Sequence, residues 1–275
     1  MVASRRALAG IVALFAPLVP VSVAVTPASA AVASPPPVQA VASRPAPPPG
    51  AIASAFVANQ LTYCSLICPH MLDFVVQIPT ALVQAPGVYV VARSRGETSD
   101  RATGIAARSV TRPADSAMAG IIDNDLNIVL PRAQNALEVA VVGMLDVADT
   151  ARSGATPGAV GQSFGTARAD ILDALNAPIV RNPPDIAVPH TPAQAGALDV
   201  IDRGSAVLFQ APEMLLPEAT KSADLAAQTL ASTGDVQRAA AVGVDHFTQA
   251  LGRANELIEQ ANTAHHTLNR NPAQA

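Results

Sequence analysis

Apolar residues recur at every third or fourth position along most of the chain from Ala51 onward, and this spacing places them on one face of an α-helix. The longest run covers residues 236–268, about nine turns, with small residues at many apolar positions. Two shorter runs cover 114–130 and 132–151. Pro131 lies between them and is expected to end the first helix, because proline lacks a backbone N–H and clashes with the preceding turn. The pattern predicts long helices that pack closely on one another.

Two helix starts are marked by their own residues. Thr156 and Thr191 are each followed by proline and then by a helical apolar run, which is the order of an N-cap and a first helical residue. Residues 178–190 are proline-rich and predict an extended connection, where a boundary within the domain can be placed. Residues 88–92 fit a short strand or a buried helix equally well.

These elements predict an all-α fold, a helical bundle over residues 51–275. A weak internal echo relates residues 82–86 to 208–212 and residues 130–137 to 251–257, in the same order along the chain. The echo suggests two duplicated helical units. Chance similarity between alanine-rich helices is the alternative.

Residues 1–30 have the pattern of an export signal. Arg5 and Arg6 precede an uncharged apolar run over 7–25, and small residues then lead to an expected cleavage after Ala30. General secretion is expected rather than the twin-arginine route, and an uncleaved anchor is the alternative. We therefore expect a secreted or cell-envelope location.

Residues 31–50 follow the predicted signal and contain seven prolines among small residues. Such a composition cannot form a packed element and predicts a disordered, polyproline-like linker. The linker either spaces the helical domain from a surface or is a mature N-terminus without a role.

Charge is distributed unevenly along the chain. Between Arg44 and Arg93 the only formal charge is Asp73, so the 45–92 region must be covered by protein or by lipid. We expect the 236–268 helix to cover it, with Phe247 as a central contact. Peripheral membrane contact through the uncharged region is the alternative.

The net charge of −4 argues against nucleic acid as a partner. Five arginines against two acidic residues over 93–112 form a local basic patch, which is most often a solvated helix face. The expected partner is instead an envelope protein or a lipid.

Cys64 and Cys68 are the only cysteines. In an exported protein an even number of thiols predicts pairing, and Pro69 provides the helix distortion that a bond between residues four apart requires. Two buried thiols are the alternative. The stretch CSLICP, 64–69, also resembles the C-x-x-x-C-P motif of Sco-type copper-delivery proteins. That resemblance implies a copper site with His190 or His246 as a third ligand, on a thioredoxin fold, whereas the residues before Cys64 favour a helix.

The stretch GQSFG, 161–165, matches the nucleophile elbow of serine hydrolases, with Ser163 as nucleophile. Asp185 or Asp199 and then His246 follow in the hydrolase order. However, the residues before Ser163 are too rich in Gly and Pro for the buried strand that the elbow needs, so we expect Ser163 to be structural, near the start of a helix. No cofactor, metal site or catalytic group is predicted.

The alanine and arginine bias, the export signal and the CSLICPHMLDF region resemble uncharacterised exported Ala/Pro-rich proteins of mycobacteria and related actinobacteria. The resemblance covers about the first ninety residues and implies a location but no activity. The sequence therefore predicts an exported, non-catalytic helical protein that acts by binding or scaffolding in the cell envelope. A lipid-associating protein that uses residues 45–92 is the second hypothesis. A serine hydrolase through Ser163, or a copper or thiol protein through Cys64 and Cys68, is the third.

Overall fold

The computed structural model describes residues 45–266. The predicted signal peptide, most of the predicted linker and residues 267–275 lie outside this range. Within it every regular element is helical, which confirms the all-α prediction, and residues 88–92 are helical. In chain order the elements are α1 (Ala51–Ser94), α2 (Ser99–Asn124), the π-helical turn η1 (Asp125–Val129), α3 (Leu130–Arg152), α4 (Pro157–Asn176), α5 (Pro192–Ser205), the π-helical turn η2 (Ala206–Gln210), α6 (Ala211–Thr233) and α7 (Val236–Thr263).

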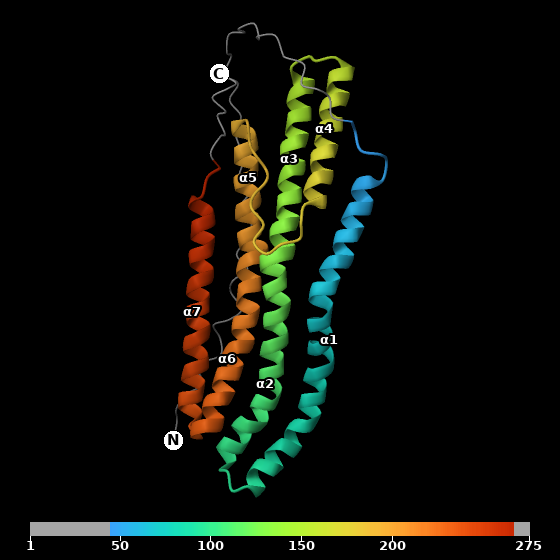
Figure 1. The fold of residues 1–275 in the computed structure, drawn as a ribbon. Coiled ribbons are helices and arrows are strands. Elements are labelled where there is room, and N and C mark those ends of the chain that lie inside the picture. Colours follow the sequence, from blue (N-terminus) through green and yellow to red (C-terminus); the bar gives the residue numbers. More distant parts are fainter. Residues whose placement is uncertain (1–44, 267–275) are drawn as a thin grey trace. The chain divides into compact units, whose positions relative to one another are not determined.

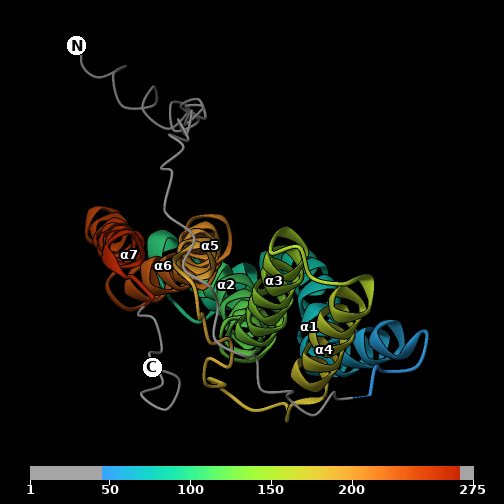
Figure 2. The same ribbon diagram turned by 90° about the horizontal axis from the view of Figure 1, so that it is seen from above.

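The helices form a bundle of side-by-side rods (Figure 1). The segment α2–η1–α3 is one continuous rod, and α5–η2–α6 is a second. The first rod contacts α1 through α2 and α4 through α3, while the second contacts the first and also carries α7. Seen from above, α7 and α1 lie on opposite sides of these two central rods (Figure 2).

Side-chain caps begin four of the helices. The capping residues, each accepting a hydrogen bond from a backbone N–H of the first turn, are Thr98, Thr156, Thr191 and Asp235. The helix starts predicted at Thr156 and Thr191 are thus confirmed. At Thr191 the cap is reciprocal, because the Gln194 side chain accepts a hydrogen bond from the Thr191 N–H at 3.0 Å.

The helix break predicted at Pro131 is wrong. The chain continues from α2 through η1 into α3, and Pro131 is the second residue of α3. Proline leaves the carbonyl four residues earlier, that of Asn127, without its usual helical donor. Here the backbone N–H of Asn182 donates to that carbonyl at 2.6 Å. Pro212 follows η2 at the same position, so each π-helical turn is followed by a proline that the widened helix accommodates.

Small residues set the distance between the rods. A Cβ atom on Gly104 of α2 would lie 2.2 Å from the backbone nitrogen of Ala231 in α6. A Cβ on Gly143 of α3 would lie 2.8 Å from the Cβ of Ala167 in α4. The close helix packing expected from the small apolar positions is therefore present in the central rods.

The predicted packing of the 236–268 helix across the uncharged region is also wrong. The helix α7 packs on α6 and α5, whereas α1 packs on α2 and α4. Phe247 is half-buried in α7. The apolar side of α7 packs on α6 instead, because the short turn after α6 places these two helices side by side. As a result, the outer side of α1 is left uncovered within the described chain.

The connection between α4 and α5 packs against the first central rod. Arg181 pairs with Asp123 at 2.7 Å, and the side chain of Asn135 donates to the carbonyl of Pro184 at 2.9 Å. The two echo pairs lie in different settings, since residues 82–86 are inside α1 and residues 208–212 span the junction of η2 and α6. Duplication remains a hypothesis.

Candidate functional site: helix α1 and the groove beside it

Helix α1 is the longest element in the described range and exposes most of its apolar side chains. Of its 44 residues only Asn59, Tyr63 and Ala92 are buried. Eleven large apolar side chains are exposed, among them Leu72 at 64% and Val83 at 81%. By length and hydropathy two helical stretches, α1 and the α2–η1–α3 rod, could cross a membrane, and the most apolar window of α1 has no buried residue. An isolated apolar residue on a surface is ordinary, but a continuous apolar face marks an interaction site.

The exposed half of α1 contains a regular apolar stripe. Its positions are spaced by four, three and four residues, so the pattern repeats every eleven residues from Val57 to Val90. None of the positions is charged or carries a polar amide or hydroxyl group, and all are exposed except Cys68, which is half-buried. We call this set the apolar stripe: Val57, Leu61, Cys64, Cys68, Leu72, Val75, Pro79, Val83, Pro86 and Val90.

A second, polar stripe runs beside the first. It comprises Thr62, Asp73, Gln77, Thr80 and Gln84, all exposed. Four of these residues directly follow a residue of the apolar stripe, which places them about 100° further around the helix. The exposed half of α1 therefore has a continuous apolar strip, with polar groups concentrated along one side of it; Val76 and Val91 are exposed apolar residues on that same side.

Hydroxyl groups on α1 bond to the helix itself. Thr62 donates to the carbonyl of Ala58 at 3.0 Å, and Thr80 donates to the carbonyl of Val76 at 2.7 Å. This back-bonding satisfies the hydroxyl without water. It makes the outer surface of α1 less polar than its composition suggests.

Cys64 and Cys68 are joined by a disulfide in the structure. The bond spans one turn in the apolar stripe, directly before Pro69. His70 lies against α2, where its ring occupies the space beside Gly120. The motif resembling copper-delivery proteins is thus inside a helix of an all-α fold, which contradicts the thioredoxin fold that the resemblance implied. Within residues 45–266 no cluster of three His, Cys, Asp or Glu side chains is placed to hold a metal ion.

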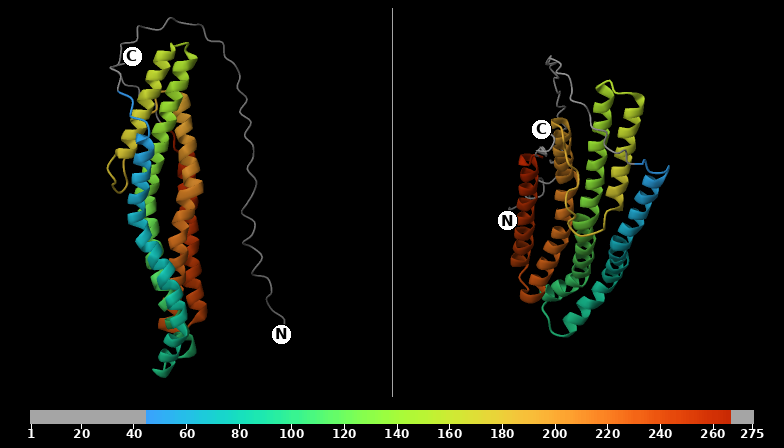
Figure 3. Two further views of the ribbon diagram at one scale, coloured as in Figure 1. Left: turned by 90° about the vertical axis from the view of Figure 1, so that its right-hand side faces the viewer. Right: turned by 45° about the horizontal axis from the view of Figure 1, so that its top comes forward.

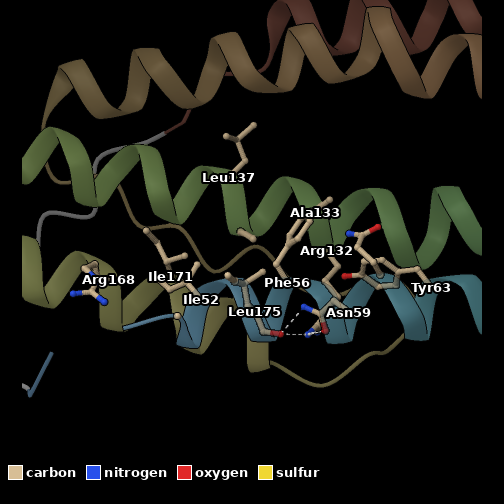
Figure 4. Close-up of a pocket in the computed structure, with 14 residues that line it drawn as sticks. Ile52, Phe56, Asn59, Tyr63, Arg132, Ala133, Leu137, Arg168, Ile171 and Leu175 are labelled. Atoms are coloured by element: carbon tan, nitrogen blue, oxygen red, sulfur yellow. Dashed lines mark hydrogen bonds between the residues drawn. The ribbon is translucent and has the colours of Figure 1, made fainter. Parts of the chain in front are cut away.

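A groove of about 630 Å³ lies beside α1, between that helix, α3 and α4 (Figure 4). Its walls are mainly apolar. The larger apolar side chains that line it are Ile52, Phe56, Leu137, Ile171 and Leu175. A groove of this volume and character can receive an apolar group of a ligand.

Arg132 closes one end of the groove and joins three helices. Its guanidinium donates to the carbonyls of Leu175 at 2.5 Å and Pro178 at 2.9 Å, and also to that of Ala177. Leu175 is in the last turn of α4, and Ala177 and Pro178 directly follow the helix, so these carbonyls stabilise the buried positive charge near the negative end of the helix dipole. Burial raises the pKa of Tyr63 of α1, and the nearby Arg132 opposes that rise. The polar end of the groove is therefore largely engaged in structural hydrogen bonds.

Two pairs of carboxyl groups lie between the central rods. Glu138 of α3 is bonded to Asp202 of α5, and Asp125 of η1 is bonded to Glu213 of α6. Burial, reinforced by neighbouring carboxylates, raises the pKa of Glu138 to about 7, and burial together with Asp125 raises the pKa of Glu213 to about 7. Gln134 donates to Asp202 at 2.6 Å and completes the first cluster. Glu138 and Glu213 can therefore each hold a proton near neutral pH.

Two histidines hold the segment after α7 against α5. His265 bonds to Asp199 at 3.0 Å, and His266 bonds to Asp202 at 2.6 Å. A hydrogen bond from the His266 backbone N–H and the His265 side chain lower the pKa of Asp199. The sequence analysis predicted neither the His265–Asp199 nor the His266–Asp202 pair, although the three-residue spacing of the two aspartates places them on one face of a helix.

The residues of the alternative hydrolase hypothesis lie in separate hydrogen-bonding environments. Ser163 lies within the first two turns of α4, as its structural interpretation predicted, and not on a strand-to-helix turn. His246 of α7 pairs with Glu218 of α6 at 2.6 Å, while Asp199 bonds to His265. His246 thus joins α7 to α6, and Asp199 joins α5 to the segment after α7.

No known protein family, no curated protein and no solved structure matches this chain. The candidate function therefore rests on the residues themselves. The feature that stands out is the apolar stripe of α1, with the groove beside it.

Proposed function

We propose that this is an exported, non-catalytic helical protein that acts by binding or scaffolding in the cell envelope, with α1 as its binding element. The supporting observation is the apolar stripe, which runs uncovered from Val57 to Val90. Full burial of one Val or Leu side chain stabilises by about 1.5–3 kcal/mol. A partner that covers the stripe would therefore gain substantial binding free energy.

The export part of the proposal is supported by the residues before the helical domain and by the disulfide. Arg5, the apolar run 7–25 and the small residues before Ala30 have the pattern of a secretion signal. Disulfides persist in oxidising compartments, which fits the bond between Cys64 and Cys68. After cleavage of the signal, the proline-rich segment 31–50 would space the helical domain from a surface of the envelope.

The proposed function is tested by the native size of the protein in mild extracts of exporting cells. We expect the wild type to migrate as an assembly larger than a single chain. Val83→Glu places a charge on the apolar stripe and should shift the protein to the size of one chain. Gln84→Glu adds the same charge to the adjacent residue on the polar stripe and should leave the assembly unchanged.

Two results would contradict this function. The first is a wild-type protein that migrates as a single chain in every mild extract. The second is an assembly that survives Val83→Glu as well as Gln84→Glu, because binding would then use another surface.

Lipid association is a second candidate, favoured by the apolar groove beside α1. An acyl chain fits the character of its walls, and the uncovered window of α1 would extend the apolar contact. Partitioning of the exported protein between buffer and detergent separates the candidates. Release into plain buffer as a monodisperse species counts against lipid association.

A further inference from the structure

We infer that the apolar stripe of α1 is covered by the same stripe of a second copy of this chain, with the two α1 helices antiparallel. The inference rests on the proposed function, because it names the partner of that binding surface. It is carried by the periodicity, the charge and the length of the stripe.

The periodicity points to a helix as the partner. An eleven-residue repeat corresponds to 3.67 residues per turn, so the stripe stays nearly straight along α1 and winds only slowly. A lipid environment requires no such register and would cover the whole exposed half of the helix. On the adjacent flank, Asp73, Gln77 and Gln84 are exposed polar side chains that favour contact with water over hydrocarbon. This division fits a single partner helix lying on one side.

The charge distribution makes the stripe complementary to itself. No residue of the stripe carries a formal charge, so the apolar contact brings no like charges together, and the two Asp73 residues near the two-fold axis stay on the exposed polar stripe, where solvent screens them. The basic residues Arg93 and Arg95 lie just beyond one end of the stripe. A parallel pair would bring these arginines together, whereas an antiparallel pair separates them by the length of the stripe.

An antiparallel pair also matches residues along the stripe. With the two-fold axis at the middle, Leu72 meets Val75 of the second copy, and Val57 meets Val90 of the second copy. The disulfide between Cys64 and Cys68 then lies opposite Val83 and Pro79 of the second copy. Apolar groups face apolar groups at each of these positions.

The length of the stripe is sufficient for a specific interface. At 1.5 Å per residue it extends about 50 Å, and a helix is about 10 Å wide, so it covers roughly 500 Å² on each copy. The total of roughly 1,000 Å² reaches the size at which specific interfaces begin. We therefore expect a dimer of modest affinity, which dissociates on dilution.

The test uses the protein as processed and exported by the expressing cell, purified and examined alone by sedimentation equilibrium. We expect the wild type to show a dimer that dissociates with dilution. Val83→Glu and Val75→Glu should each raise the dimer dissociation constant by at least about tenfold, because each buries an unpaired charge in the interface. Both side chains are mostly exposed, at 81% and 65%, so circular dichroism should show unchanged helix content. Gln84→Glu is the matched control and should leave the dissociation constant within about twofold of wild type.

Three outcomes would overturn the inference. They are a wild-type monomer at every concentration, a dimer equally stable in both stripe variants, and a monomer that floats with phosphatidylcholine vesicles through Val83. The third would assign the stripe to lipid. If the purified protein is monomeric while the cellular assembly still depends on Val83, the proposed function stands and the partner is another protein.

Discussion

Arg132 carries a positive charge into the interior because carbonyls at the end of α4 and just beyond it accept hydrogen bonds from its guanidinium. It is 5% exposed and links α3 to α4 and to Asn59 of α1. Glu138, which is 2% exposed, avoids a buried charge instead of pairing it, because burial raises its pKa until it holds a proton near neutral pH. Neither role was predicted from the sequence, because each depends on residues that are distant along the chain.

Replacement of Arg132 should destabilise the fold. Arg132→Met removes the donor to three carbonyls at and just after the end of α4 and should lower the free energy of unfolding by about 2–4 kcal/mol, measured by urea denaturation. Arg152→Met, on the same helix but exposed, should change it by less than about 0.5 kcal/mol. Equal effects of the two variants would show that the carbonyls of α4 do not depend on Arg132.

The stability of the protein should fall as pH rises from about 4.5 to 7. In this range the folded protein keeps the proton on Glu138, whose pKa is raised to about 7 from 4.5, whereas the unfolded chain has lost it. The contribution is fully present below pH 4.5 and is lost above about pH 7. Its size is on the order of 1–3 kcal/mol.

Urea denaturation at several pH values between 5 and 8 measures this dependence. Glu138→Gln carries no titrating group and should flatten the dependence, leaving the share that belongs to Glu213. Glu259→Gln changes an exposed carboxyl of α7 and should keep the wild-type profile. A profile for Glu138→Gln that matches wild type would contradict the raised pKa of Glu138.

At the scale of elements, the sequence predicted the helices better than the connections between them and their packing partners. The cap at Thr191 and the apolar periodicity depend on neighbouring residues, so both could be read locally. The continuation of the helix through η1 could not, since it depends on the π-helical turn before Pro131 and on a hydrogen bond to the Asn127 carbonyl from Asn182 in a distant segment. The partner of α7 was also mispredicted, because an apolar stripe specifies burial but not which helix provides it.

Glycine at the α2–α6 contact should be required for that packing. Gly104→Ala brings a methyl group against the backbone of Ala231, which cannot move aside as a flexible side chain would. We expect the free energy of unfolding to fall by about 1–3 kcal/mol or more. Gly196→Ala, in a helix with open space around it, should instead raise it by about 0.5–1 kcal/mol. Thermal unfolding of the two variants side by side checks both signs, and a stable Gly104→Ala variant would contradict the close contact.

At the scale of the molecule, the open question is what covers the outer side of the uncharged region, residues 45–92. The sequence showed that residues 45–92 require a cover, and the structure shows that α2 and α4 cover only one side of α1. The division of the other side into two stripes could have been read from the sequence. It became meaningful only once the structure showed which side of α1 faces its neighbours.

The most direct measurement is site-specific photo-crosslinking from the apolar stripe in exporting cells. A photoreactive residue at Leu72 should form an adduct with α1 of a second copy, identified by mass spectrometry of the crosslinked peptides. The same residue at Gln84, on the polar stripe, should form no such adduct. Absence of a protein adduct from Leu72, or adducts with lipid alone, would contradict the account of α1 as a surface that binds a second copy.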